Sequence, residues 1–287
     1  MTIVLSLIVS IFHINATPAM KNRVLTSRDL VHVQKVSMPS VTPDGKTLFY
    51  VSTKYCLKSN KGKSFIFKTS ARKEAKSERI TDKGMSAIFP SVSPNGKTLA
   101  FIGIDKEGAH IFLKEIASAK PATRLTDKKL LPYGAMGPLV WAPDSKGLLF
   151  NAAVPPQCQD LTCMAKEKAK KPTSSGWLFK GLMYRHWNEW RGGLVNKLFH
   201  ILVKTKAVTL ITKSKHDTPP VALGGHQDYA FSPDGKEIAY VKNTDKMVAR
   251  STNNDVWLYS MKSGKHRQLT TGKGNDFSPK YSPDGRY

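Results

Sequence analysis

The chain has 287 residues, 40% hydrophobic and 23% charged, an ordinary balance for a soluble globular protein with one large domain or two smaller ones. Its 45 basic residues outnumber its 21 acidic ones, and the net charge of +24 would attract nucleic acid, anionic lipid or acidic ligands. The basic residues recur at equivalent turn positions instead of forming one stretch, which argues against a nucleic-acid partner; examples are Lys46, Lys97, Lys146 and Lys236.

The first predicted element is an apolar segment from Ile3 to Ile14, which is too short to span a bilayer as a helix. Small residues suited to signal peptidase follow at Ala16 and Ala19, although no Lys or Arg precedes the segment. The alternative is a buried strand. We expect residues 1–19 to be a signal peptide and the mature chain, 20–287, to be periplasmic or secreted, with no membrane span.

A Ser-Pro-Asp-Gly-type motif then recurs along the chain, and apolar and β-branched residues flank each copy. Successive prolines of the motif are 51, 49, 90 and 50 residues apart, so a repeat of about fifty residues is interrupted by one insertion of about forty. The prolines are Pro43, Pro94, Pro143, Pro233 and Pro283.

Each copy of the motif predicts strand, tight turn, strand. Pro fixes φ at the first corner, Asp suits the second, and Gly takes the left-handed conformation that closes the hairpin. An alternating segment such as Ile111–Ile116 follows, and then an Arg-Leu-Thr-like segment such as Arg124–Thr126. Because each repeat holds about four short strands, the predicted fold is an all-β propeller with four blades, the start of a fifth and one short helical insertion.

The insertion is predicted at about residues 155–193. Asp160 is expected to cap a short helix that runs through Lys171 and ends before Pro172.

Two of the three cysteines, Cys158 and Cys163, lie five residues apart at the start of the insertion. A zinc site would need two more ligands at suitable spacing, and none lies beside the pair. In an oxidising compartment a disulfide is therefore the better interpretation. The third cysteine, Cys56, is expected to be a buried small apolar residue.

No segment carries a recognisable catalytic pattern: the sequence has no Gly-x-Ser-x-Gly elbow, no His-Glu-x-x-His helix and no phosphate-binding glycine loop. The turn aspartates recur in register, which could suggest a metal or acid–base site, but Asp at such a turn hydrogen-bonds its own backbone. We therefore predict no metal, no cofactor and no catalytic residue in the chain. The aspartates are Asp44, Asp144, Asp234 and Asp284.

The densest aromatic and charged stretch, residues 177–191, forms the second half of the insertion. It mixes charge with flat apolar area, as recognition hot spots do. The alternative is a hairpin whose tryptophans pack the insertion onto the blade while its charges are merely solvated. The candidate binding residues are Arg185, His186, Trp187, Glu189 and Trp190.

Three features together resemble the N-terminal propeller of prolyl oligopeptidase family serine peptidases, in particular the secreted dipeptidyl-peptidase and acylaminoacyl-peptidase-like bacterial branch. The Pro-Asp-Gly repeats alone are also found in TolB-like periplasmic propellers. The three features are Asp29-Leu30 with Val36-Ser37-Met38-Pro39, the Cys158–Cys163 pair before a Lys-rich helix, and the run from Tyr184 to Trp190.

The resemblance implies a ring of seven or eight blades that caps a C-terminal α/β-hydrolase domain with a Ser, Asp and His triad, and it implies short peptides as substrates. The sequence stops inside its fifth turn motif, so we expect the catalytic domain to be absent and the chain alone to be inactive. Glu189 is then the candidate partner for the α-amino group of a peptide. The alternative is a non-enzymatic, TolB-like propeller that binds protein partners. Neither the repeats nor the resemblance predicts an oligomeric state.

Overall fold

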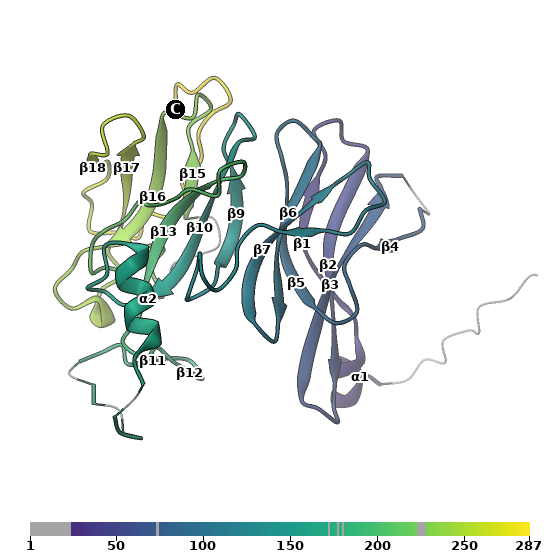
Figure 1. Cartoon of the computed structure of the whole chain (residues 1–287), viewed down its shortest axis with the longest axis horizontal. Helices are drawn as coiled ribbons and strands as arrows, with labels where there is room; N and C mark the ends of the chain where they lie inside the picture. The colour runs from purple at the N-terminus through teal and green to yellow at the C-terminus, as the bar shows by residue number, and fades with distance from the viewer. Residues whose placement is uncertain (1–23, 73–74, 172, 177, 180, 223–227) are drawn as a thin grey trace, which may run out of the picture.

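The computed structural model describes residues 24–287 except 73–74, 172, 177, 180 and 223–227, so the predicted signal peptide at 1–19 lies outside the described residues. Four antiparallel sheets of four strands each lie side by side, and each sheet is an up-and-down meander (Figure 1). The chain has the predicted all-β propeller fold, and the four sheets are its blades. No helix in this part of the chain is both long and apolar enough to cross a membrane.

The first two blades follow one another without interruption. Blade 1 comes after a short helix, α1 (Ser27–His32), and contains β1 (Lys35–Val41), β2 (Thr47–Cys56), β3 (Lys61–Ser70) and β4 (Glu78–Arg79). Blade 2 contains β5 (Ser86–Val92), β6 (Thr98–Asp105), β7 (Gly108–Glu115) and β8 (Thr123–Arg124).

The insertion divides the third blade between its second and third strands. Blade 3 contains β9 (Met136–Trp141), β10 (Gly147–Val154), β13 (Val195–Leu202) and β14 (Val208–Leu210). Blade 4 contains β15 (Tyr229–Phe231), β16 (Glu237–Asn243), β17 (Asn254–Ser260) and β18 (His266–Gln268), with a 3-10 turn, η1 (Val248–Arg250), between β16 and β17.

The repeated Pro-Asp-Gly motif forms the turn between the first and second strands of each blade. In blade 1, Thr42 Oγ1 donates to Asp44 Oδ1 at 2.6 Å, and the Lys46 N–H donates to the same oxygen at 3.1 Å. These two hydrogen bonds lower the pKa of Asp44 below its ordinary value, and Gly45 takes the left-handed φ of +68°. The other turn aspartates also accept the N–H two residues further on, so their structural role is confirmed: Asp144, Asp234 and Asp284.

Blade 3 shows why one copy of the motif is irregular. Ser145 takes the left-handed corner with φ +61°, and its Oγ accepts the N–H of Asn95 in the turn of blade 2 at 3.1 Å. The glycine lies two positions later, at Gly147, where β10 passes His200 so closely that a Cβ would collide with His200 Nε2. Close packing against the buried His200 ring therefore favours glycine at this position.

The Arg-Leu-Thr-like segment ends each blade at its outer edge. In blade 2 the Thr126 hydroxyl accepts the Ile111 N–H at 2.9 Å, while the Leu125 N–H donates to the Ile111 carbonyl at 2.8 Å. The same threonine contact joins the third strand to the chain after the fourth strand in the other blades; the pairs are Thr81 with Ile66, Thr212 with Leu198, and Thr270 with Val256.

Apolar side chains fill the spaces between neighbouring blades, and a few polar contacts fix their spacing. The Trp141 Nε1–H of blade 3 donates to the Ser91 carbonyl of blade 2 at 2.9 Å, and the Tyr229 hydroxyl of blade 4 donates to the Pro138 carbonyl at 2.5 Å. Burial of each large apolar side chain stabilises such a core by roughly 1.5–3 kcal/mol. Buried members between blades 2 and 3 include Ile102, Ile111, Leu148 and Phe150.

Strand alternation gives the propeller two different faces. The Pro-Asp-Gly turns and the turns from third to fourth strands lie on one face, at the top of Figure 1, which we call the turn face. The connections from second to third strands, α1 and the insertion lie on the opposite face, which we call the insertion face (Figure 1). Any site on the insertion is therefore remote from the repeated turns.

One predicted core residue is not buried. Cys56 is a free, exposed cysteine at the end of β2, so the prediction that it is a small buried residue is wrong. The reason is that β2 and β3 are each ten residues long and extend beyond the rest of their sheet, which leaves the last residues of β2 in solvent.

Candidate functional site

The insertion begins with a covalently closed loop and a short helix. The predicted disulfide joins Cys158 and Cys163. Helix α2 (Leu161–Ala169) starts where the sequence predicts, because Asp160 Oδ1 accepts the Cys163 N–H at 2.7 Å. The helix ends before the predicted Lys171.

A buried lysine fixes this loop to blade 3. Lys197 on β13 is fully buried, and its Nζ donates to the carbonyls of Pro156 and Cys158 at 3.0 and 2.7 Å. Burial lowers the pKa of Lys197 below its ordinary value. Sequence analysis missed this residue, although a lysine on the core-facing side of an alternating strand is the signal for such a role.

Beyond α2, the aromatic stretch folds into a small hairpin. Strand β11 (Arg185–His186) pairs with β12 (Glu189–Trp190), and Trp187 at the turn has φ +48°. The Trp190 ring stacks on two other rings of the insertion, Phe179 at 6.0 Å and Tyr184 at 6.1 Å between centroids.

The hairpin presents its candidate residues to solvent. Trp187 and Trp190 are 79% and 65% exposed, so neither packs the insertion tightly onto a blade. His186 lies directly across the hairpin from Glu189, and its ring meets Trp187 edge-on at 6.0 Å between centroids. The structure thus brings together all five predicted site residues on one short hairpin.

The two neighbouring arginines are engaged elsewhere. Arg185 donates to the carbonyl of Trp187 at 2.7 Å. Arg191 binds both carboxylate oxygens of Asp217, at 2.6 and 2.9 Å. Within the described residues, the exposed Glu189 carboxylate has no hydrogen bond and no ion pair. Its negative charge is therefore available to a ligand.

Two hollows adjoin the hairpin. One, of about 380 Å³, is lined by residues including Phe179, Tyr184, Arg191 and Asp217. The other, of about 360 Å³, lies between residues 182–187 and Ala249 of blade 4. The insertion and blade 4 therefore form the walls of these hollows together.

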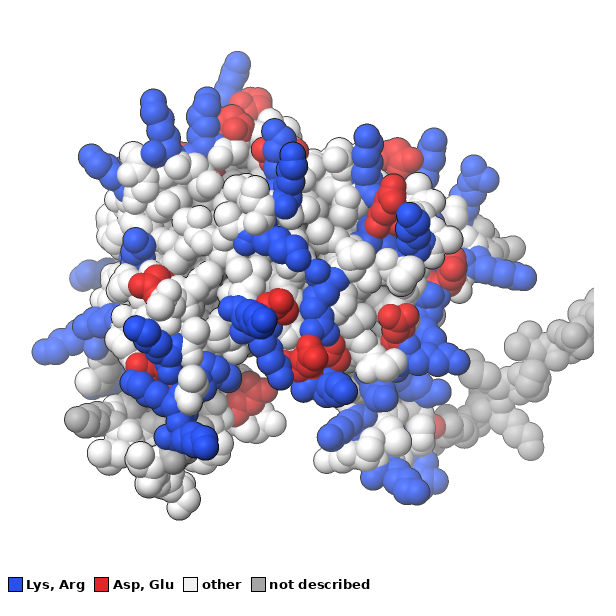
Figure 2. Space-filling view, in the orientation of Figure 1, with Lys and Arg blue, Asp and Glu red and all other residues white. Residues whose placement is uncertain are grey.

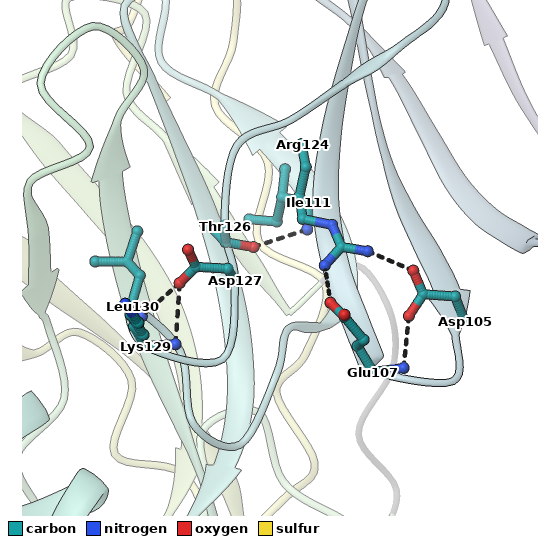
Figure 3. Close-up of polar contacts among 8 residues, drawn as sticks. All are labelled: Asp105, Glu107, Ile111, Arg124, Thr126, Asp127, Lys129 and Leu130. Carbon is teal, nitrogen blue, oxygen red and sulfur yellow. Dashed lines mark hydrogen bonds and ion pairs between the residues drawn. The ribbon is translucent and has the colours of Figure 1, made fainter.

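A third hollow, of about 560 Å³, lies between α2 and blade 2 on the same face. An Arg124 ion-pair cluster supports its wall, since Arg124 binds Asp105 and Glu107 across the β6–β7 hairpin (Figure 3). The pKa of Arg124 is raised above its ordinary value, and the main cause is the hydrogen bond to Glu107. Asp127 accepts hydrogen bonds from two backbone N–H groups at 2.9 Å and holds the loop that follows (Figure 3).

The described residues contain no group of three or more His, Cys, Asp or Glu side chains suited to a metal ion.

Comparison with known proteins agrees with the propeller geometry. No protein-family model matches the chain. Dipeptidyl-peptidase 5 of Porphyromonas gingivalis is 27% identical over 275 residues, which cover 91% of this chain and 38% of the relative. The chain thus spans well under half the length of this curated relative.

Two solved structures show the same fold. An acylaminoacyl peptidase of Pyrococcus horikoshii superposes with a TM-score of 0.56 at 17% identity, over 83% of this chain and 32% of that one. TolB from Acinetobacter baumannii superposes with a TM-score of 0.51 at 19% identity, over 88% of this chain and 47% of that one.

Proposed function

We propose that this chain is the substrate-gating propeller of an exported serine peptidase of the prolyl oligopeptidase family that acts on short peptides. Similarity to a dipeptidyl-peptidase over 91% of the chain supports the proposal, as does the fold shared with an acylaminoacyl peptidase. In this proposal the Ser, Asp and His triad lies in an α/β-hydrolase domain beyond residue 287. The propeller restricts access and orients the peptide.

The unpaired carboxylate of Glu189 carries the proposal. An exopeptidase that removes residues from a free N-terminus needs an anion to hold the substrate's α-ammonium group. Glu189 is suited to this role because neither neighbouring arginine forms an ion pair with it: Arg185 donates to a backbone carbonyl and Arg191 binds Asp217. The exposed rings of Trp187 and Trp190 offer flat apolar area beside it.

The strength of this contact depends on water. An exposed ion pair contributes only about 0.2–1 kcal/mol. A hydrogen bond to a charged group that is shielded from water contributes about 1.5–3 kcal/mol. We therefore propose that the chain alone prefers the free amine by about 0.2–1 kcal/mol, and that the preference grows when the peptide and the covering domain exclude water from the hairpin.

Export to the periplasm or the exterior is part of the proposal. The Cys158–Cys163 disulfide supports it, because disulfides form and persist in oxidising compartments.

A direct binding experiment tests the role of Glu189. The full chain is titrated with a dipeptide and with its N-acetylated form, and binding is followed by NMR. We expect Glu189→Gln to remove the preference for the free amine. The matched control is Glu167→Gln, since Glu167 lies on α2 of the same insertion and pairs with Lys170 at 2.6 Å. Equal binding of both peptides to the unmodified chain would refute the assignment.

The alternative, a non-enzymatic propeller that binds protein partners, is supported only by the fold that this chain shares with TolB. Reading the coding sequence beyond residue 287 separates the two: a Gly-x-Ser-x-Gly segment within the following domain supports the peptidase, and a stop after the remaining blades supports the scaffold.

A further inference from the structure

The turn face carries basic residues that the peptide site does not explain. In all four blades, the turn between the third and fourth strands holds exposed basic side chains, and we call these four turns the outer turns. They are residues 71–77, 116–122, 203–207 and 261–265. Among their described positions there is no acidic residue, and Lys73 and Glu74, outside the described part, cancel in formal charge. The basic residues are Arg72, Lys76, Lys120, Lys204, Lys206, Lys262 and Lys265.

The inner turns on this face are almost neutral by comparison. Lys236 lies 3.0 Å from Asp234 and Arg286 lies 3.5 Å from Asp284, so a turn aspartate offsets each cation. In blade 2 the aspartate is replaced by Asn95, and Lys97 adds one uncompensated charge. The outer turns therefore dominate the charge of the turn face.

The opposite face carries basic side chains of two kinds. Some pair with carboxylates, as Arg124 does with Asp105 and Glu107. Others are exposed without an ion pair in the described residues, but they are gathered on single segments such as the β2–β3 hairpin instead of recurring in every blade. The outer-turn lysines make no ion pair with any described carboxylate. Figure 2 shows basic side chains standing along the edge of the molecule that corresponds to the turn face in Figure 1.

We propose that the turn face docks on an anionic lipid surface and leaves the insertion face, with Glu189, directed toward the solution. The four blades present their turns at one edge, so the cations are spread over a broad surface that a bilayer can contact at many points. Anionic headgroups attract such Lys and Arg side chains without insertion into the hydrocarbon.

Lipid fits this surface better than single-stranded nucleic acid does. The four outer turns contain no Phe, Tyr, Trp or His, whereas single-stranded nucleic acid is held by bases stacked on aromatic side chains. The attraction is electrostatic, so binding must weaken steeply as salt screens it. This inference does not depend on the proposed peptide site.

Flotation with lipid vesicles tests the proposal, because vesicle-bound protein rises in a density gradient while free or aggregated protein does not. The full chain is mixed with phosphatidylcholine vesicles that contain about 30% phosphatidylglycerol, and with pure phosphatidylcholine vesicles. We expect binding to the anionic vesicles only, and its loss at high salt. Removing four outer-turn charges, with Lys204, Lys206, Lys262 and Lys265 changed to Gln, should reduce binding about tenfold or more.

A matched variant removes the same charge from the insertion face. Lys54, Lys58, Lys61 and Lys63 lie on the exposed β2–β3 hairpin, and their change to Gln should leave binding within about twofold. Equal losses in the two variants would mean that binding follows net charge alone, and the proposal would be wrong. Absence of binding to anionic vesicles, or tighter face-dependent binding to an oligonucleotide at the same salt, would also overturn it.

Discussion

Arg191 and Asp217 form a two-pronged ion pair, with N–O distances of 2.6 and 2.9 Å and side chains only 12% and 18% exposed. The pair joins the end of the aromatic hairpin to the loop after β14, and Asp217 also accepts the Asn196 N–H at 2.7 Å. The same pair prevents Arg191 from neutralising Glu189. Thus one contact both positions the candidate site and leaves its charge free.

Loss of this pair should loosen the insertion and leave the blades folded. Arg191→Lys keeps the positive charge, but an ammonium group cannot form the bidentate contact with both carboxylate oxygens of Asp217. Asp217→Ala removes the acceptor of three hydrogen bonds. We expect a local destabilisation of about 1–3 kcal/mol. Limited proteolysis should therefore cleave the variants faster between residues 181 and 195. The matched control, Lys170→Gln, breaks a more exposed pair with Glu167 and should leave cleavage unchanged.

The displaced glycine of blade 3 leads to a second prediction. In Gly147→Ala the new methyl group would collide with His200 Nε2, and overpacking of this kind costs about 1–3 kcal/mol. Gly84→Ala is the control, because nothing lies within 4 Å of a Cβ there. Urea unfolding of both variants checks the prediction, and equal stability would show that the strand can move away from His200.

The fifty-residue repeat made the blades predictable from the sequence. Each repeat carries a Pro-Asp-Gly turn and a Thr hydroxyl contact, and both depend on residues that are close together in sequence. The interrupted repeat also located the insertion, while the capping residue Asp160 predicted the start of α2 and the spacing of the two cysteines predicted the disulfide. Strand alternation could have marked Lys197 as buried, but the sequence does not show which carbonyls it binds or that Asp217 pairs with Arg191, since folding brings these segments together. Cys56 was placed wrongly because residue type does not show that a strand extends beyond its sheet.

His200 should make folding sensitive to acid. It is buried between Gly147 and the Phe231 ring, and burial lowers its pKa below the ordinary value of 6.5. Below pH 6.5 the unfolded chain therefore binds a proton at His200 that the folded chain resists, so the free energy of unfolding falls as pH falls.

Thermal unfolding of the unmodified chain and of His200→Gln at pH 7.5 and 5 measures this dependence. The variant should lose less stability on acidification, although other histidines with lowered pKa values, His216 and His266, remain. An identical pH response in the two proteins would contradict the assignment.

The disulfide should contribute a modest, local stabilisation. Because Cys158 and Cys163 are only five positions apart, the loop-entropy model gives about 2 kcal/mol. Cys163→Ser should lower the stability of the insertion accordingly, while Cys56→Ser, at an exposed site, should not. Peptide mapping without reductant should show Cys158 linked to Cys163; two alkylated thiols at these positions would refute the pairing.

The proposed role of Glu189 predicts a specific dependence of peptide binding on pH. An α-amino group has a pKa of about 7.7–8.0, so a dipeptide loses its positive charge as pH rises through this range. If Glu189 holds the ammonium form, affinity for the free dipeptide should fall between about pH 7 and 9, and affinity for the N-acetylated dipeptide should stay constant. Glu189→Gln should abolish the difference because an amide carries no charge to pair with the amine. Trp187→Ala, which removes only exposed apolar area, should weaken both peptides equally and preserve the pH dependence. A pH dependence that survives in Glu189→Gln would assign amine recognition to another group.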